Sequence, residues 1–296
     1  MTTTTVLAIG YQDNWVQILG SGFMRNALIG GTLVALAAGL IGYFIIVRNS
    51  AFAAHALAHI GFPGATGAVL VGLPVAAGLA IFCIGGALVI GALGKRADER
   101  EVATGTVLAA ATGLGLFFSS LATRSSSTVT NVLFGNLLAV THEQLVTFGI
   151  GLAVIAAVMA VVYRPLLFAS VNPEVAEARG VPVRALSVVF MVLLGLSITM
   201  AVQAVGTLLL FALVVTPAAT AIMLTARPGL AMAVSTGMAI ASVWVGLAAS
   251  AMFNVPPSFV ITTIVTGVWL AVWSVAKRGR TTPRVTSSHG ATSTDA

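Results

Sequence analysis

Two histidines, His55 and His59, stand four residues apart in the apolar stretch Ala51–Gly64, which reads AFAAHALAHIGFPG. On an α-helix this spacing places both imidazoles on the same face, one turn apart. The stretch ends in the Gly-Phe-Pro-Gly segment 61–64, where proline lacks a backbone donor and glycine has no side chain to stabilise a helical turn. We therefore predict that the helix is interrupted directly after the two histidines.

A pair of neutral imidazoles is a ligand set that suits zinc and other borderline divalent metals. Membrane transporters also form substrate sites where a helix is broken beside polar side chains. These two arguments predict that His55 and His59 are metal ligands. The alternative is that both rings only pack and hydrogen-bond across helices, and the residues alone leave it open.

The composition indicates a polytopic membrane protein. Of 296 residues, 58% are hydrophobic and only 7% are charged, and the mean hydropathy is +1.05. Such a chain has too few charges to cover a soluble core, and its apolar runs of roughly 20 residues match the thickness of a bilayer. Cys83 is the only cysteine, which excludes a disulfide framework. The net charge of +6 is explained by basic cytoplasmic loops, so we expect no nucleic-acid partner.

The acidic residues and the missing motifs exclude several function classes. All eight Asp and Glu residues lie in predicted loops, in span ends or in the tail. This distribution argues against a proton-coupled secondary transporter with an acidic relay. The sequence also has no Gly-rich phosphate loop followed by Lys-Ser or Lys-Thr, and no hydrolase motif. We therefore expect that this chain is not an enzyme and binds no cofactor of its own.

The predicted fold class is all-α: a polytopic transmembrane helical bundle of about eight or nine spans, nine preferred, with discontinuous helices. The nine spans are expected at Ala27–Val47, Phe52–Leu73, Val75–Leu93, Val102–Leu121, Val146–Tyr163, Ala185–Gln203, Thr207–Thr225, Leu230–Phe253 and Ser258–Ala276. A short apolar piece, Val132–Val140, is expected to be a re-entrant or surface helix. With the basic loops in the cytoplasm, nine spans put the N-terminus outside and the C-terminus inside. Eight spans would move the N-terminus inside.

The chain divides into three regions. Residues 1–24 are expected to form an N-terminal interfacial segment. Residues 25–278 form the transmembrane domain. Residues 279–296 are basic and then rich in Ser and Thr, which is typical of a disordered tail.

The longest polar stretch between spans contains the signals of a short capped helix. Asn172 is a suitable N-cap, Pro173 suits the first helical position, Glu174 and Glu177 lie in the early turns, and Gly180 ends the helix. We expect this helix to stand on the cytoplasmic side, where its charges keep it out of the membrane.

A second interrupted helix is predicted in segment 206–221, which contains Thr216-Pro217. Pro217 frees the backbone carbonyl one turn earlier, and the hydroxyl of Thr216 or Thr220 can compensate. These three residues are predicted to line the transport path. A kinked helix that only packs is equally compatible with the sequence.

Four motifs in the same order resemble those of one protein family. His-Ala-Leu-Ala-His at 55–59 and Phe-Pro-Gly at 62–64 resemble an Asp-Ala-Leu-Ser-His and Leu-Pro-Gly signature. The second motif is Leu-Phe-Gly-Asn-Leu-Leu-Ala-Val at 133–140, which is similar to Leu-Phe-Gly-Ser-Ile-Leu-Ala-Val. The third is Asn-Pro-Glu at 172–174 with Ala-Arg-Gly at 178–180, which matches a loop with Asp-Pro-Glu, Ala and Gly. The fourth lies at 205–221 and matches closely. The resemblance covers about residues 27–277 and is to the membrane permeases of zinc, manganese and iron ABC importers.

The resemblance implies several partners. Two permeases would form a homodimer around one path in the bacterial plasma (inner) membrane, and an extracytoplasmic binding protein would deliver the metal ion. A separate ABC ATPase subunit, which binds and hydrolyses ATP, would dock on the capped helix. Its coupling residues would be Asn172, Pro173, Glu174, Glu177, Arg179 and Gly180.

The resemblance also bears on the metal. His59 matches the family's histidine, whereas His55 stands where the family has Asp. Because imidazole replaces a hard carboxylate, we expect zinc as the transported ion, with manganese and iron as alternatives. This departure leaves open whether His55 binds metal at all. Competing functions are a permease for a metal chelate such as a siderophore or cobalamin, a partner-independent secondary metal transporter, and a non-transporting scaffold.

Overall fold

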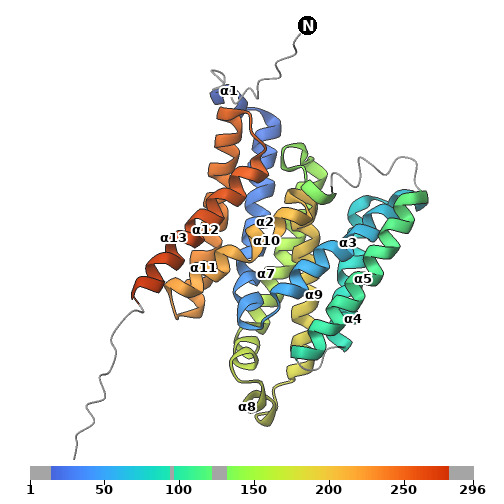
Figure 1. Cartoon of the computed structure of the whole chain (residues 1–296), viewed down its shortest axis with the longest axis vertical. Helices are drawn as coiled ribbons and strands as arrows, with labels where there is room; N and C mark the ends of the chain where they lie inside the picture. The colour runs from blue at the N-terminus through green and yellow to red at the C-terminus, as the bar shows by residue number, and fades with distance from the viewer. Residues whose placement is uncertain (1–14, 94–96, 122–131, 280–296) are drawn as a thin grey trace, which may run out of the picture.

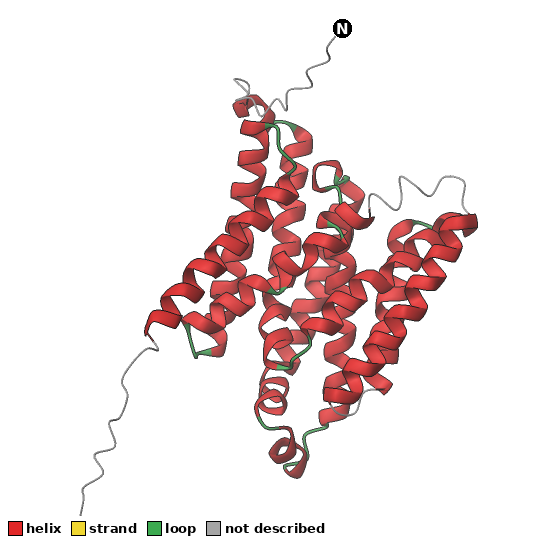
Figure 2. Cartoon of the chain, in the orientation of Figure 1, coloured by secondary structure: helices red, strands yellow, loops and turns green. Residues whose placement is uncertain are grey.

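The computed structural model describes residues 15–93, 97–121 and 132–279 (Figure 1). Within these ranges all regular structure is helical and there is no strand (Figure 2). The elements are α1 (Trp15–Leu19), α2 (Gly22–Val47), α3 (Ala51–Val71), α4 (Val75–Leu93), α5 (Ala97–Leu121), the 3-10 helix η1 (Leu137–Ala139), α7 (His142–Val171), α8 (Pro173–Ala178), α9 (Val183–Val205), α10 (Thr207–Val214), α11 (Thr216–Leu224), α12 (Pro228–Phe253) and α13 (Pro257–Gly279).

Eight helices within the described residues are long and apolar enough to cross a membrane: α2, α3, α4, α5, α7, α9, α12 and α13. This confirms the predicted polytopic bundle. The reason is local, because each run of about 20 apolar residues can satisfy its backbone in a bilayer only as a helix.

The predicted ninth span, Thr207–Thr225, is not one helix but two, α10 of eight residues and α11 of nine. The break falls at Val215, directly before Thr216-Pro217, as the sequence predicted. Together α10 and α11 return the chain from the end of α9 to the start of α12 (Figure 1). The chain therefore makes nine passes if α10 and α11 together are counted as one span, and eight if they are not. The C-terminal end of α13 lies away from α1, as an odd number of passes requires.

The predicted interruption at residues 61–64 is wrong, because α3 is continuous through Pro63 and ends at Val71, with Gly72 as its C-cap. Gly72 adopts the left-handed conformation, with φ of 71°. The hydroxyl of Thr66 donates to the carbonyl of Phe62, 3.1 Å away, one turn along the same helix. Tertiary packing can hold a proline within a membrane helix, and here that packing involves α4.

Close contact between α3 and α4 explains the glycine after Pro63. A Cβ on Gly64 would lie 2.2 Å from the carbonyl oxygen of Gly78, so the two backbones touch. Small residues at helix interfaces allow such approach within membranes. Gly64 therefore serves helix packing rather than a break, and the histidines lie on an uninterrupted helix.

Several boundaries also differ from the prediction. Helix α7 has 30 residues and continues through Pro165 to Val171, well beyond the expected end at Tyr163. It begins with a capping box, in which Thr141 and Gln144 exchange hydrogen bonds. Between Val132 and Val140 the described chain has a helical piece at 132–134 and then η1, separated by residues 135 and 136, in place of one continuous re-entrant or surface helix. The loop 124–131, residues 1–14 and the tail from residue 280 lie outside the described residues.

The centre of the bundle is formed by α2 and α9, whose most apolar windows are each 67% buried, against 11% for α5 and α13. Helices α3, α4 and α5 pack together on one side and join the centre mainly through α4 and α9. Helices α11, α12 and α13 pack on the other side against α2 (Figure 1). Helix α3 also contacts α10, so the histidine-bearing helix meets the discontinuous helix.

Candidate functional site

The structure brings His55 and His59 together on one face of α3. Their ring centroids are 4.8 Å apart and the rings meet edge to face, at 71°. Both side chains are half-buried in the single chain. This geometry follows directly from the spacing of four residues on a continuous helix.

Phe211 of α10 completes the surroundings of His55. The centroids of the two rings are 6.2 Å apart and the planes meet at 82°. Phe211 is 40% exposed, so the edge of this site is open at the surface of the single chain. Sequence reasoning missed Phe211, because it sits in the uniformly apolar stretch TLLLFALV, and only the contact between α10 and α3 singles it out.

Within residues 15–93, 97–121 and 132–279, no His, Cys, Asp or Glu side chain joins the two imidazoles as a third ligand. Among the residues that the structure describes, no three His, Cys, Asp or Glu side chains are grouped to hold a metal ion. Cys83 is buried on α4, where its thiol donates to the carbonyl of Leu57 at 3.4 Å. A metal ion bound at His55 and His59 would need water or groups of another chain to complete its coordination.

The residues predicted to line the path at the second break are largely internal. Pro217 and Thr220 are buried, and Thr216 is half-buried. The hydroxyl of Thr220 donates to the carbonyl of Thr216 at 2.8 Å. The Thr220 hydroxyl therefore does not satisfy the carbonyl of Leu213, which Pro217 leaves without its helical donor, so the predicted compensation is wrong for Thr220.

The capped helix predicted at 172–180 is confirmed as α8. Asn172 Oδ1 accepts a hydrogen bond from the backbone N–H of Val175 at 3.1 Å, and Pro173 is the first helical residue. The helix ends at Ala178, and Gly180 then turns the chain with φ of 80°. In Figure 1, α8 is an isolated tip at the end of the molecule opposite α1. Its exposed residues Glu174, Glu177 and Arg179 are available to a partner.

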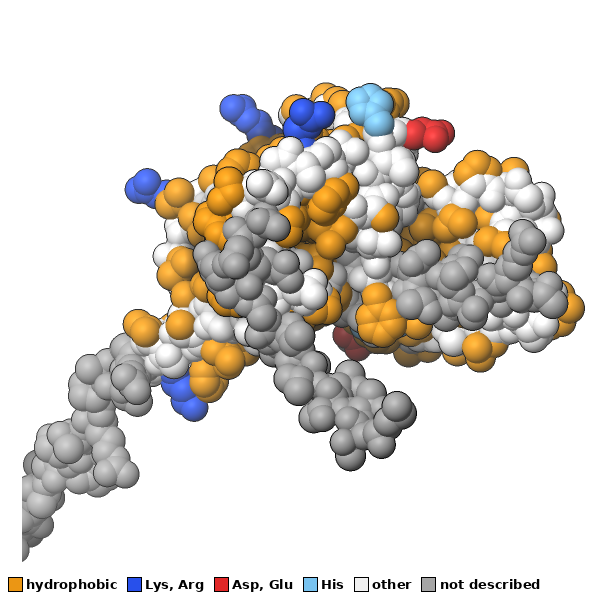
Figure 3. Space-filling model, turned by 90° about the horizontal axis from the view of Figure 1, so that it is seen from above, with side chains coloured by type: hydrophobic (Ala, Val, Ile, Leu, Met, Phe, Trp, Pro, Cys, Tyr) orange, Lys and Arg blue, Asp and Glu red, His pale blue; other side chains and the backbone are white. Residues whose placement is uncertain are grey.

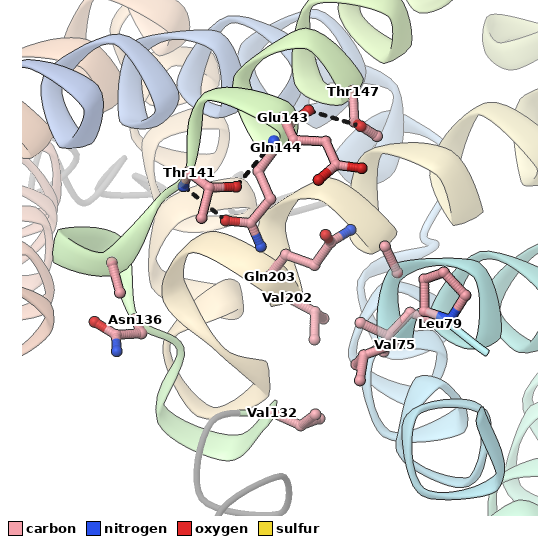
Figure 4. A pocket seen from close by; sticks show the side chains of 13 residues that line it. Val75, Leu79, Val132, Asn136, Thr141, Glu143, Gln144, Thr147, Val202 and Gln203 are labelled. Carbon is pink, nitrogen blue, oxygen red and sulfur yellow. Dashed lines mark hydrogen bonds between the residues drawn. The ribbon is translucent and has the colours of Figure 1, made fainter. Parts of the chain in front are cut away.

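A cavity of about 440 Å³, lined by polar and apolar residues but by no histidine, lies between the starts of α4 and α7 and the end of α9 (Figure 4). Glu143 is the one charged residue among those that line it. This carboxylate is in the first turn of α7, where the helix dipole stabilises it. The nearby end face carries few charged side chains among hydrophobic and uncharged ones (Figure 3).

Comparison with known proteins shows one family. The family described as "ABC 3 transport family" matches residues 21–276. The manganese transport system membrane protein MntC of Halalkalibacterium halodurans is 34% identical over 81% of this chain and 82% of its own length. MntC of Listeria innocua is 33% identical over 87% of this chain and 92% of its own length.

Two solved structures share the fold. A chain of PsaBC from Streptococcus pneumoniae, in complex with Fab, superposes with a TM-score of 0.78 at 28% identity, and the match covers 88% of this chain and 94% of that one. An inward-facing putative metal-chelate type ABC transporter gives a TM-score of 0.67 at 15% identity, which shows the fold alone. The match over residues 21–276 and the eight apolar helices identify the chain as a member of the ABC 3 transport family, a multi-pass permease of metal-ion ABC importers in the bacterial plasma membrane.

Proposed function

We propose that this chain is the permease subunit of an ATP-driven importer of a divalent transition-metal ion, and that His55 and His59 bind the ion during its passage. The edge-to-face contact of the two imidazoles, 4.8 Å between centroids, carries the proposal. Ionisable residues within membrane spans are expensive, so a pair of them on one face indicates function. The relatives are named as manganese transport proteins, which supports a metal ion as the cargo.

A second copy of the chain completes the site in this proposal. The two rings and Phe211 lie on a face that is partly exposed in one chain, although these helices are otherwise closely packed. Two copies would contribute four imidazole groups, and four nitrogen ligands satisfy a tetrahedral ion such as zinc. The homodimer thus supplies the ligands that one chain lacks.

The choice of metal rests on two observations that point in different directions. The relatives are named for manganese, at 33–34% identity. The residue at position 55 is an imidazole donor, which favours zinc over manganese, since manganese prefers carboxylate and water. We propose zinc, because the donor belongs to this chain itself, and manganese is the second candidate.

Replacing one donor tests the choice of metal. His55→Asp provides the carboxylate donor while it retains the spacing to His59. We expect the ratio of zinc to manganese uptake to fall about tenfold, which corresponds to about 1.4 kcal/mol of selectivity. Uptake of both radioactive ions into proteoliposomes that contain the permease, its ATPase and its binding protein measures the ratio.

Two results would contradict parts of this proposal. If the wild-type complex takes up manganese in preference to zinc, the assignment of zinc is wrong and the second candidate stands. If His55→Asp leaves the ratio unchanged, position 55 does not contact the ion.

We further propose that the ABC ATPase subunit docks on α8 and that an extracytoplasmic metal-binding protein approaches the opposite end. Three features of α8 support the docking: its N-cap, its exposed charges and its position at the tip of the molecule. In this arrangement ATP binds only to the partner subunit. Conformational changes of that subunit during ATP hydrolysis move α8, and through it the adjoining ends of α7 and α9.

Removal of the N-cap tests the docking. Asn172→Ala removes the acceptor for the N–H of Val175, which costs about 1 kcal/mol of local helix stability. We expect metal-dependent ATP hydrolysis to fall about fivefold, because α8 would be less often helical when the ATPase meets it. Thr141→Ala is the matched control, since it removes the N-cap of α7 at the other end of the bundle. An equal loss of hydrolysis in both variants would contradict docking at α8.

A further inference from the structure

The side chain of Arg48, at the end of α2, joins two other helices. Its Nη1 donates to Ser170 Oγ at 3.1 Å, and its Nη2 donates to Ser187 Oγ at 2.5 Å. The guanidinium carbon also lies over the ring of Phe190, 5.2 Å from the centroid. Ser170 is in the last turn of α7, whereas Ser187 and Phe190 are in the first turns of α9.

Arg48 thus contacts the two helices that flank α8 in the chain, at the end of α7 and at the start of α9. Only Asn172 separates α7 from α8, and four residues, 179–182, separate α8 from α9. Ser170 donates its own proton to the carbonyl of Leu166 at 2.6 Å, so its oxygen is free to accept from Arg48. A displacement of α8 that moves the adjoining ends of α7 and α9 must therefore move or break the contacts of Arg48.

On its other side, Arg48 is connected to α3 by a hydrogen-bonded turn. The N–H of Asn49 donates to Ile46 at 3.1 Å, and the N–H of Ser50 donates to Ile45 at 2.8 Å. Asn49 has φ of 50°, so the three features together form a Schellman motif. Helix α3 starts at the next residue, Ala51, because the carbonyl of Ser50 already accepts the N–H of Ala54. His55 is one turn further along this helix.

We propose that Arg48 is a positioning residue of the transport cycle, which transmits the movement of α8 to α3 and hence to the two histidines. The inference rests on the proposed function, in which the ATPase docks on α8. Arginine suits this role, because its planar fork can donate to two hydroxyl groups at once while it stacks on an aromatic ring. Lysine at this position keeps the charge but cannot make both contacts in a fixed geometry.

The test compares metal transport with ATP hydrolysis in the reconstituted complex of permease, ATPase and binding protein. For Arg48→Lys we expect the number of metal ions imported per ATP to fall about tenfold, while ATP hydrolysis stays within about twofold of wild type. A purely structural role would lower both rates together, which leaves their ratio unchanged. The Ser170→Ala/Ser187→Ala double variant retains Arg48 and is expected to lower the same ratio about fivefold.

Arg227→Lys is the matched control. Arg227 is exposed in the connection from α11 to α12, and within the described part of the chain its side chain has no hydrogen-bond partner. It is expected to keep the wild-type ratio. If Arg48→Lys does not accumulate in the membrane, the serine double variant decides by the same ratio.

The outcomes separate this inference from the proposed function. A wild-type complex that imports no metal would overturn the proposed function, whatever Arg48 does. A wild-type ratio in Arg48→Lys, or in the serine double variant, would overturn the role of Arg48 and leave the proposed function standing. A low ratio in both variants, with a normal ratio in the control, supports it.

Discussion

Replacing His55 and His59 together by alanine is expected to lower metal uptake by more than about a hundredfold. The described residues contain no group of three or more His, Cys, Asp or Glu side chains that could replace the pair, and loss of even an outer-shell partner of a metal ligand costs about 10–100-fold. Each single variant should be severely impaired, because one imidazole per chain leaves two nitrogen donors in the proposed dimer. The measurement is growth of a deletion strain at limiting zinc, together with uptake into proteoliposomes.

His142→Ala is the control for this experiment. His142 is exposed, at the start of α7, and is not among the residues that line the nearby cavity. It is expected to support growth as wild type does. If the double variant also rescued growth fully at limiting zinc, the histidines would not be the metal site, although membership of the family would be unaffected.

Gly78→Val is expected to have the largest effect on stability, a loss of about 3 kcal/mol or more. A Cβ at Gly78 would lie 2.1 Å from the carbonyl oxygen of Gly64 and 2.7 Å from the Cβ of Ala68. Backbone atoms cannot rotate away as a flexible side chain can, so α3 and α4 must separate. Thermal unfolding of the purified permease in detergent measures the change, and a separation of these helices should also lower metal uptake, because α3 carries both histidines.

Gly85→Val provides a comparison on the same helix. A Cβ at Gly85 would meet nothing within 4 Å, so the added side chain should be accommodated and the midpoint of unfolding should change little. Equal midpoints for the Gly78 and Gly85 variants would show that α3 and α4 do not pack through Gly64 and Gly78.

Part of this molecule is determined locally, and that part was predictable. The long helices follow from the length and apolarity of each run, which the bilayer turns into a helix without help from the rest of the chain. The same holds for α8, whose N-cap Asn172 accepts from Val175 three residues further on and whose first residue is Pro173, and for the break before Pro217. The facing of His55 and His59 also needs nothing beyond helical periodicity.

Other features depend on residues that are distant in sequence. Proline and glycine at 63 and 64 predicted a break, but α3 is continuous. Gly64 instead allows the backbone of α3 to contact Gly78 of α4. No local pattern distinguished Phe211 from the other apolar residues of its segment, and no spacing related Arg48 to two serines more than 120 positions further on.

By itself, then, the sequence determined the membrane environment, the helical segments, the short capped helix α8 and the histidine pair. Only the tertiary structure decided which of the proline and glycine signals break a helix, what lies beside His55, and how the end of α2 is connected to α7 and α9. The physical reason is that hydrophobic length, capping and periodicity act between residues close in the chain. A close backbone approach or a guanidinium that joins three helices exists only once those helices have packed.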